Sequence, residues 1–341
     1  MKHVSIKDVA KALNCSVSTI SRALNDKYDI RPETRDKIIK AAKEMGYSPN
    51  PIARKLTQKQ SYSIGVVIPE FVNSFFPEVI IGIQEVFFKK GYQVLIMQSN
   101  EQYEYELANL KRLVDNFVDG IIISLTKESD NLTFIRELIE RNYPLVLFNR
   151  VDESLEVSKV IFDDYKMTFL ATEHLISQGI TDLMYLGGPI HLSLSKNRRR
   201  GFMDALNKHK LPTFSSQIIE TEFSLKSGEE IVEKLISENK VPKGLVCIND
   251  PIAIGAIKAL KNHGYKIPQD VALIGFSESP MASIIEPSLS SVLQPTREMG
   301  KLAAELLLKQ IESNSVVPMT ETIILPGTIN IRESSKITHD V

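Results

Sequence analysis

The sequence predicts an α/β protein in which an N-terminal all-α helix-turn-helix head precedes a two-subdomain body built on parallel sheets. Two observations carry this expectation: three short amphipathic helical segments come first, and short apolar runs then alternate with helical stretches. A chain of 341 residues has room for two or three domains. With 43% hydrophobic and 24% charged residues, its composition excludes disordered, collagen-like and coiled-coil proteins.

Membrane, secretion and metal signals are absent from the sequence. No apolar run approaches the roughly 18 residues that a membrane-spanning helix needs, and the first residues lack the apolar core of a signal peptide. We therefore expect a cytoplasmic protein. Cys15 and Cys247 make no disulfide framework or thiolate site, and no two of the six His have helical ligand spacing, so we expect no metal and no cofactor.

Charge is distributed unevenly along the chain. The net charge is -1, yet residues 1–60 contain 13 Lys and Arg against six Asp and Glu. A basic head on an acidic body is typical of a nucleic-acid contact at one end. A solvated basic helix face explains the charge equally well.

The head contains three helical segments with start and stop signals. Ser5 and Asp8 have capping-box spacing, Ser16 can cap the second segment, and Pro32 and Gly46 bound the third. The helices are expected at residues 5–13, 17–24 and 32–45. Two short helices joined by a tight turn over a third form a helix-turn-helix module, whose second helix has the size of a DNA major groove. The alternative is a small helical bundle that binds protein.

Two motifs of the head resemble the lactose-repressor (LacI/GalR) family of transcriptional regulators. They are SIKDVA…VSTISRALN at residues 5–25 and TRDK…AA…GYSPN at residues 34–50. The resemblance continues to about Arg332 and so covers nearly the whole chain. It implies a sequence-specific DNA-binding regulator, most simply a repressor, that acts as a homodimer on a palindromic operator.

The resemblance also implies which residues meet double-stranded DNA. We expect base-edge contacts from Val17, Ser18 and Arg22. Phosphate contacts or support are expected from Ser5, Ser16, Thr19, Ser21 and Asn25. Residues 49–62 match the family's hinge helix and linker, in which Asn50, Ala53 and Leu56 belong to the DNA contact and Leu56 wedges into the minor groove. The alternative is that Leu56 packs against the body.

The family's body resembles periplasmic sugar-binding proteins of type I, whose chain crosses three times between two subdomains. Here the crossings are expected near residues 162–164, 292–295 and 323–325. The expected division is a head at 1–48, a hinge at 49–62, a body at 63–333 and a tail at 334–341. Within the body, the N-subdomain takes about 63–162 and 294–322, and the C-subdomain takes about 163–293 and 323–333. Ligands of such sheets bind beyond the carboxyl ends of the strands, so the cleft between subdomains is the expected effector site.

Ten body residues match the family's effector-binding positions. They are Asn73, Phe75, Phe76, Asn149, Arg150, Arg198, Phe223, Asn249, Ser277 and Gln294. Asn149 and Ser277 replace acidic residues that the family usually carries, whereas both arginines are kept. Because arginine suits carboxylate and phosphate recognition, this pattern favours a sugar acid or sugar phosphate. A neutral sugar held by amide side chains is the alternative.

Catalytic constellations are missing from the sequence. It has no phosphate-cradling glycine loop, no Gly-x-Ser-x-Gly and no His-Glu-x-x-His, so we do not expect an enzyme. The competing interpretation is a sugar-binding protein of a transport or sensory system without DNA binding. The absent signal peptide and the head argue against it.

Overall fold

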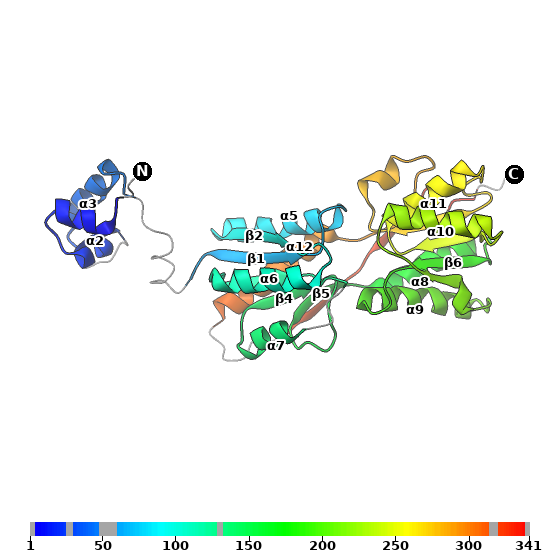
Figure 1. The fold of residues 1–341 in the computed structure, drawn as a ribbon, viewed down its shortest axis with the longest axis horizontal. Helices are drawn as coiled ribbons and strands as arrows, with labels where there is room; N and C mark the ends of the chain where they lie inside the picture. Colours follow the sequence, from blue (N-terminus) through cyan, green and yellow to red (C-terminus); the bar gives the residue numbers. More distant parts are fainter. Residues whose placement is uncertain (1–3, 25–29, 48–59, 128–131, 314–319, 338–341) are drawn as a thin grey trace. The chain divides into compact units, whose positions relative to one another are not determined.

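The computed structural model divides the chain into two units, residues 1–62 and 63–341, and describes residues 4–24, 30–47, 60–127, 132–313 and 320–337 (Figure 1). Within the first unit lie α1 (Ile6–Ala12), α2 (Val17–Leu24) and α3 (Pro32–Glu44). The Ser5 Oγ accepts from the Asp8 amide at 3.4 Å, and the Ser5 amide donates to Asp8 Oδ2 at 2.8 Å, which confirms the predicted capping box. Val9, Ile20 and Ile38, one from each helix, form the buried centre of this small core.

In the second unit, sheet A has the strand order β11-β5-β4-β3-β1-β2, with all neighbours parallel. Its strands are β1 (Ser63–Ile68), β2 (Gln93–Gln98), β3 (Gly120–Ile123), β4 (Leu145–Phe148), β5 (Ser158–Phe162) and β11 (Thr322–Leu325). The helices that cover it are α5 (Phe75–Lys89), α6 (Tyr103–Asp115), α7 (Thr133–Glu140) and α12 (Thr296–Glu312). Val66 belongs to the core under α5 and α12, while its neighbour Val67 packs with Leu110 of α6. Both faces are covered, which is why these strands read as continuous apolar runs.

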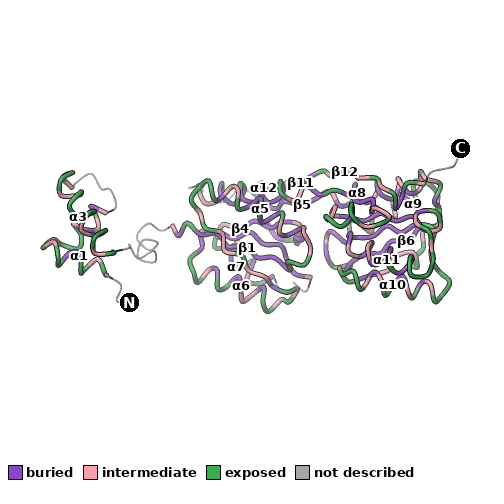
Figure 2. The backbone as a smooth tube through the Cα atoms, turned by 90° about the horizontal axis from the view of Figure 1, so that it is seen from above, coloured by how far each residue is buried: buried purple, intermediate pink, exposed green. Residues whose placement is uncertain are grey.

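Sheet B repeats the arrangement with the order β12-β10-β9-β8-β6-β7. Its strands are β6 (Leu183–Gly187), β7 (Ile218–Glu220), β8 (Gly244–Cys247), β9 (Ala272–Phe276), β10 (Ser290–Leu293) and β12 (Thr328–Asn330). The helices are α8 (Asp164–Ser177), α9 (Ser193–Lys208), α10 (Leu225–Ser237) and α11 (Asp250–Asn262), with short 3-10 turns at Ser215–Gln217 and Pro280–Ser283. Only β12 runs antiparallel, against β10. Buried residues, purple in Figure 2, concentrate on the strands of both sheets. No helix in the described part of the chain is long and apolar enough to cross a membrane.

Three segments carry the chain from one sheet to the other. The first two lie where they were predicted, between β5 and α8 and between β10 and α12. The third prediction, near residues 323–325, is wrong. These residues form β11 and pair with β5 of sheet A, so the crossing lies between Leu325 and Thr328. Residues 323–325 therefore belong to the N-subdomain.

The predicted tail also begins too early. Ser334 and Ser335 are fully buried, and the Leu273 amide of β9 donates to the Ser334 carbonyl at 2.7 Å. Ser334 Oγ returns a hydrogen bond to the Leu273 carbonyl at 2.8 Å. These hydrogen bonds hold the segment after β12 against sheet B, so the body extends past residue 333.

Glycines let paired helices approach closely on both sheets. A Cβ on Gly82 of α5 would lie 2.1 Å from the Arg297 carbonyl oxygen, and one on Gly300 of α12 would lie 2.0 Å from the Val79 carbonyl oxygen. On sheet B, a Cβ on Gly255 of α11 would lie 2.0 Å from the Leu225 carbonyl oxygen of α10. Since backbone atoms cannot move aside as flexible side chains do, these helix–helix contacts require glycine.

Gly300→Ala is expected to lower the free energy of unfolding by about 1–3 kcal/mol, because overpacking outweighs the helix propensity that alanine adds. Urea unfolding followed by circular dichroism measures the change. Glu305→Ala, at an exposed position of the same helix, should stay within about 0.5 kcal/mol of the wild type. Equal stability of Gly300→Ala and the wild type would contradict the close crossing.

Candidate functional site

The head presents one polar helix face to solvent. Ser16, Val17, Ser18 and Arg22 are exposed at α2, while Ile20 on the opposite side is fully buried. The Ser16 Oγ lies 2.7 Å from the Ser18 Oγ and accepts from the Thr19 amide at 3.0 Å, which confirms it as the helix cap. Short side chains of this kind allow the helix start to approach a phosphate or a base edge closely.

The remaining residues of the predicted DNA contact divide into two groups. Ser5 is exposed at the start of α1, and Thr19 and Ser21 are half-buried on α2. Asn25, Asn50, Ala53 and Leu56 lie outside the described residues.

In the body, one cavity of about 80 Å³ collects side chains from both sheets. All ten predicted effector residues line it. The lining adds six residues that sequence reasoning did not select: Glu70, Ser74, Leu194, Ile248, Pro251 and Ser279. They come from the ends of β1, β8 and β9 and the starts of α5, α9 and α11, so the carboxyl ends of parallel strands meet here, as expected for such sheets.

Aromatic rings form the apolar part of the wall. Phe75 and Phe76, at the start of α5, pack edge to face with centroids 5.2 Å apart, and Phe76 makes a similar contact with Phe148 at 6.1 Å. Both rings are largely buried, yet both line the cavity. Packed rings of this kind offer a rigid apolar surface to the C–H faces of a ligand.

Arg150 is held in place by a carboxylate. Its Nη1 donates to both oxygens of Glu101, at 2.8 and 2.7 Å, and its guanidinium lies 4.9 Å from the centroid of the Phe223 ring. Glu101 also accepts from the Lys127 amide at 3.0 Å. The guanidinium therefore reaches the cavity with its charge already neutralised.

Arg198 is fixed even more tightly. Its Nε donates to Asp164 Oδ1 at 2.7 Å, its Nη1 donates to the Ile248 carbonyl, and its guanidinium stacks 3.5 Å from the centroid of the Phe276 ring. Both charged side chains of this pair are almost completely buried. Burial raises the pKa of the Asp164 carboxyl, and the Arg198 guanidinium opposes that rise.

The loop after β9 has an unusual backbone. Ser277 has φ of 105° and Glu278 has φ of 54°. The Ser277 amide donates to the Val292 carbonyl at 2.9 Å, the Glu278 amide donates to Ser291 Oγ at 3.0 Å, and the Ser279 amide donates to Asp250. These bonds hold a strained loop at the cavity, a combination common at ligand sites.

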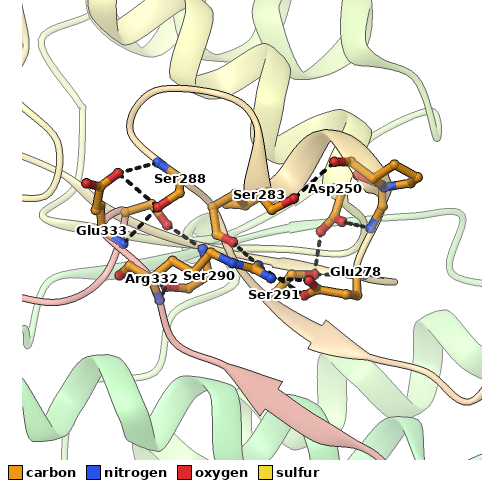
Figure 3. Close-up of polar contacts among 12 residues, drawn as sticks. Asp250, Glu278, Ser283, Ser288, Ser290, Ser291, Arg332 and Glu333 are labelled. Carbon is orange, nitrogen blue, oxygen red and sulfur yellow. Dashed lines mark hydrogen bonds and ion pairs between the residues drawn. The ribbon is translucent and has the colours of Figure 1, made fainter.

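Side chains behind this loop complete its support (Figure 3). The Arg332 guanidinium pairs with the Glu278 carboxylate, and its Nη1 also donates to the Leu289 carbonyl at 2.7 Å. Glu278 therefore does not line the cavity. Burial raises the pKa of Asp250 to about 6, against hydrogen bonds from Ser291 and Ser279 that lower it. Asn249, and not Asp250, caps α11, since its Oδ1 accepts from the Ile252 amide at 3.0 Å.

One polar atom of the cavity wall, Gln294 Nε2, is buried and has no hydrogen-bond partner among the described residues. Gln294 is only 3% exposed, and a buried amide nitrogen without a partner is costly. A ligand oxygen would satisfy it.

Of the three polar residues that sequence reasoning missed, Ser74 immediately precedes α5, and Glu70 and Ser279 lie two or three residues beyond the end of a strand, β1 or β9. This position was the available signal, because ligands bind beyond the carboxyl ends of such strands. No group of His, Cys, Asp and Glu that suits a metal ion occurs among the described residues. Rings, amides, hydroxyls and paired arginines suit a small polar organic ligand.

Comparisons with known proteins agree with both units. The family model of bacterial regulatory proteins of the lacI family matches residues 5–50, and the periplasmic binding protein-like domain matches residues 172–335. Catabolite control protein A of Priestia megaterium is 30% identical over 337 residues, which cover 98% of this chain and all of that protein.

Two solved structures are similar in fold. The Lac repressor dimer bound to operator and the anti-inducer ONPF has a TM-score of 0.85 at 24% identity, over 98% of this chain and 99% of that one. A LacI family regulator from Enterococcus faecium with bound ribose has a TM-score of 0.70 at 27% identity, over 80% of this chain and 98% of that one. The chain therefore belongs to the LacI family of DNA-binding transcriptional repressors, with an N-terminal helix-turn-helix and a periplasmic-binding-protein-like α/β body.

Proposed function

We propose that this repressor binds a palindromic operator as a homodimer and that a small carbohydrate-type effector in the cavity controls its operator affinity. The observation that carries the proposal is the cavity itself. It gathers side chains from both sheets, and Gln294 of its wall lies on one of the three crossings. A ligand held there contacts both subdomains and so favours one separation of them.

Operator recognition is assigned to the exposed face of α2. Arg22→Ala is expected to weaken binding of the preferred operator by about 10- to 100-fold and to relax its sequence preference, because a side chain that reads a base edge contributes about 1–3 kcal/mol of discrimination. Fluorescence anisotropy with operators selected from random DNA measures both effects. Binding should also weaken steeply between 50 and 200 mM salt, as counterions are released.

Lys226→Ala is the matched control for Arg22→Ala. It removes one positive charge from an exposed position at the start of α10 in the body. Its operator affinity should equal that of the wild type. Equal affinity and equal sequence preference of Arg22→Ala and the wild type would contradict the assignment of α2.

A second copy of the chain is assigned to an apolar surface on the N-subdomain. Ile81 and Phe88 lie two helical turns apart on α5 and are 38% and 83% exposed. Ile96 is exposed on β2, which is an edge strand of sheet A. A helix stripe beside an unpaired edge strand suits a self-complementary interface. The Lac repressor structure, similar in fold, is a dimer.

Phe88→Asp is expected to shift the protein toward monomer and to weaken operator binding, since each monomer then reads one half-site alone. Sedimentation velocity and anisotropy measure the two effects. Phe214→Asp changes another exposed ring, 61% exposed before β7, and should leave both unchanged. A Phe88→Asp protein that remains dimeric at micromolar concentration would place the interface elsewhere.

The effector is assigned to carbohydrates because the wall combines rings with hydrogen-bonding groups. The E. faecium regulator, similar over most of the body, contains ribose. The two arginines were the reason to expect an anion, but each already contacts a carboxylate, Glu101 or Asp164. The charge argument for an anionic effector therefore loses its support, and the neutral alternative gains.

Gln294→Leu is expected to keep or slightly raise the thermal stability of the ligand-free protein, because it removes a buried donor that has no partner. The same change should weaken effector binding by about tenfold, since one hydrogen bond to the ligand is lost. Thermal-shift titration with mono- and disaccharides reports both quantities. Unchanged ligand affinity in Gln294→Leu would remove Gln294 from the site.

A further inference from the structure

One carboxylate in the cavity wall has no positively charged partner among the residues that the structure describes. Glu70 follows β1 and lines the cavity together with Asn73. Its Oε1 accepts from Asn73 Nδ2 at 2.8 Å, and its Oε2 accepts from the Asn73 amide at 3.0 Å. No Lys, Arg or His of the described residues forms an ion pair with it. A carboxylate has about four acceptor sites, so each oxygen retains room for a second donor.

The other charges of the wall are balanced. Glu70, Arg150 and Arg198 are the only charged residues that line the cavity in the described part of the chain. Arg150 forms an ion pair with Glu101, with 2.7 Å between Nη1 and Oε2. Arg198 forms an ion pair with Asp164, with 2.7 Å between Nε and Oδ1. The charge that a ligand meets without a counter-ion is therefore the negative charge of Glu70.

We propose that Glu70 determines the specificity of the effector site, an inference that rests on the proposed function. Its carboxylate accepts a hydrogen bond from a ligand hydroxyl and rejects ligands that bring a carboxylate or phosphate into the cavity. Gln294 Nε2, which is buried and has no partner among the described residues, donates to a ligand oxygen. The ligand class is a neutral polyhydroxy compound.

The rejection follows from placing like charges together out of bulk water. The repulsion between a ligand anion and Glu70 is not fully offset by attraction to Arg150 or Arg198. The positive charges of these two arginines are already paired with the carboxylates of Glu101 and Asp164. A hydroxyl donor, in contrast, makes a charge-assisted hydrogen bond to the same carboxylate. The Glu70 side chain thus favours binding of a neutral sugar over binding of the corresponding sugar acid or sugar phosphate.

Isothermal titration calorimetry of the full chain tests this with matched pairs: glucose, galactose and ribose against glucuronate, galacturonate and ribose 5-phosphate, with cellobiose and maltose added. In the wild type, at least one neutral sugar should bind, and more tightly than its charged counterpart. Glu70→Gln should weaken the binding of that neutral sugar by about tenfold. It should also reduce the ratio of its affinity to the affinity of the charged counterpart. Gln keeps an acceptor for one Asn73 donor, and the unfolding midpoint without ligand checks that the variant is folded.

Glu78→Gln is the matched control. It removes the same charge from the exposed first turn of α5, at a residue that does not line the cavity. Its affinities should equal those of the wild type, whereas a Glu78→Gln protein with the same altered preference as Glu70→Gln would reduce the effect to general charge and overturn the proposal.

The outcomes separate this inference from the proposed function. Tighter binding of a charged sugar, or an unchanged preference in Glu70→Gln, overturns the role of Glu70 and leaves a carbohydrate-controlled repressor standing. No binding of any neutral or charged sugar overturns both the role of Glu70 and the carbohydrate effector.

Discussion

The buried ion pair between Arg198 and Asp164 is the contact on which the geometry of the cavity in the body depends. Asp164 opens α8 directly after the first crossing, and Arg198 comes from α9, so the pair joins the crossing to the helix layer of sheet B. The same guanidinium stacks on Phe276 and bonds to the Ile248 carbonyl, at the ends of β9 and β8. Removing either partner would leave an unpaired charge in the interior, which costs about 3–5 kcal/mol. The cavity floor is therefore fixed before a ligand enters.

Each of the three crossings is connected to the cavity by a side chain. Asp164 follows the first and holds Arg198, and Gln294 lies on the second. Arg332 follows β12, beyond the third, and pairs with Glu278 of the strained loop that carries Ser277 and Ser279. In the proposed function, a ligand that draws these groups together acts on all three connecting strands at once. In this arrangement, effector binding can change the closure of the two subdomains while each sheet moves as a rigid body.

The sequence predicted the architecture and much of the site, because both leave local signals. Capping residues such as Ser5 and Ser16 mark helix starts, and the residues after strand ends mark the cavity. All ten predicted effector residues line the cavity in the body. What the sequence did not reveal are the partners of the charges. Glu101 lies 49 positions before Arg150, and nothing local indicates that the two side chains meet.

Contacts between distant parts of the chain are invisible in one sequence. Nothing local therefore indicated the carboxylate partners of Arg150 and Arg198. Residues 323–325 were placed in the C-subdomain by resemblance to the family, and their pairing with β5, about 160 positions earlier, leaves no local signal in the sequence. Glu70 was missed because no family motif marks it, although it follows a predicted strand.

The proposed function requires that effector binding in the cavity and operator binding be thermodynamically linked. The most direct measurement titrates the wild-type protein with a cavity-binding sugar in the absence and in the presence of saturating selected operator DNA. The sugar affinity should change by roughly 5- to 150-fold, and the operator affinity should change by the same factor when the sugar is saturating. Equal affinity of a cavity-binding sugar for free and operator-bound protein would rule out control of operator binding from the cavity.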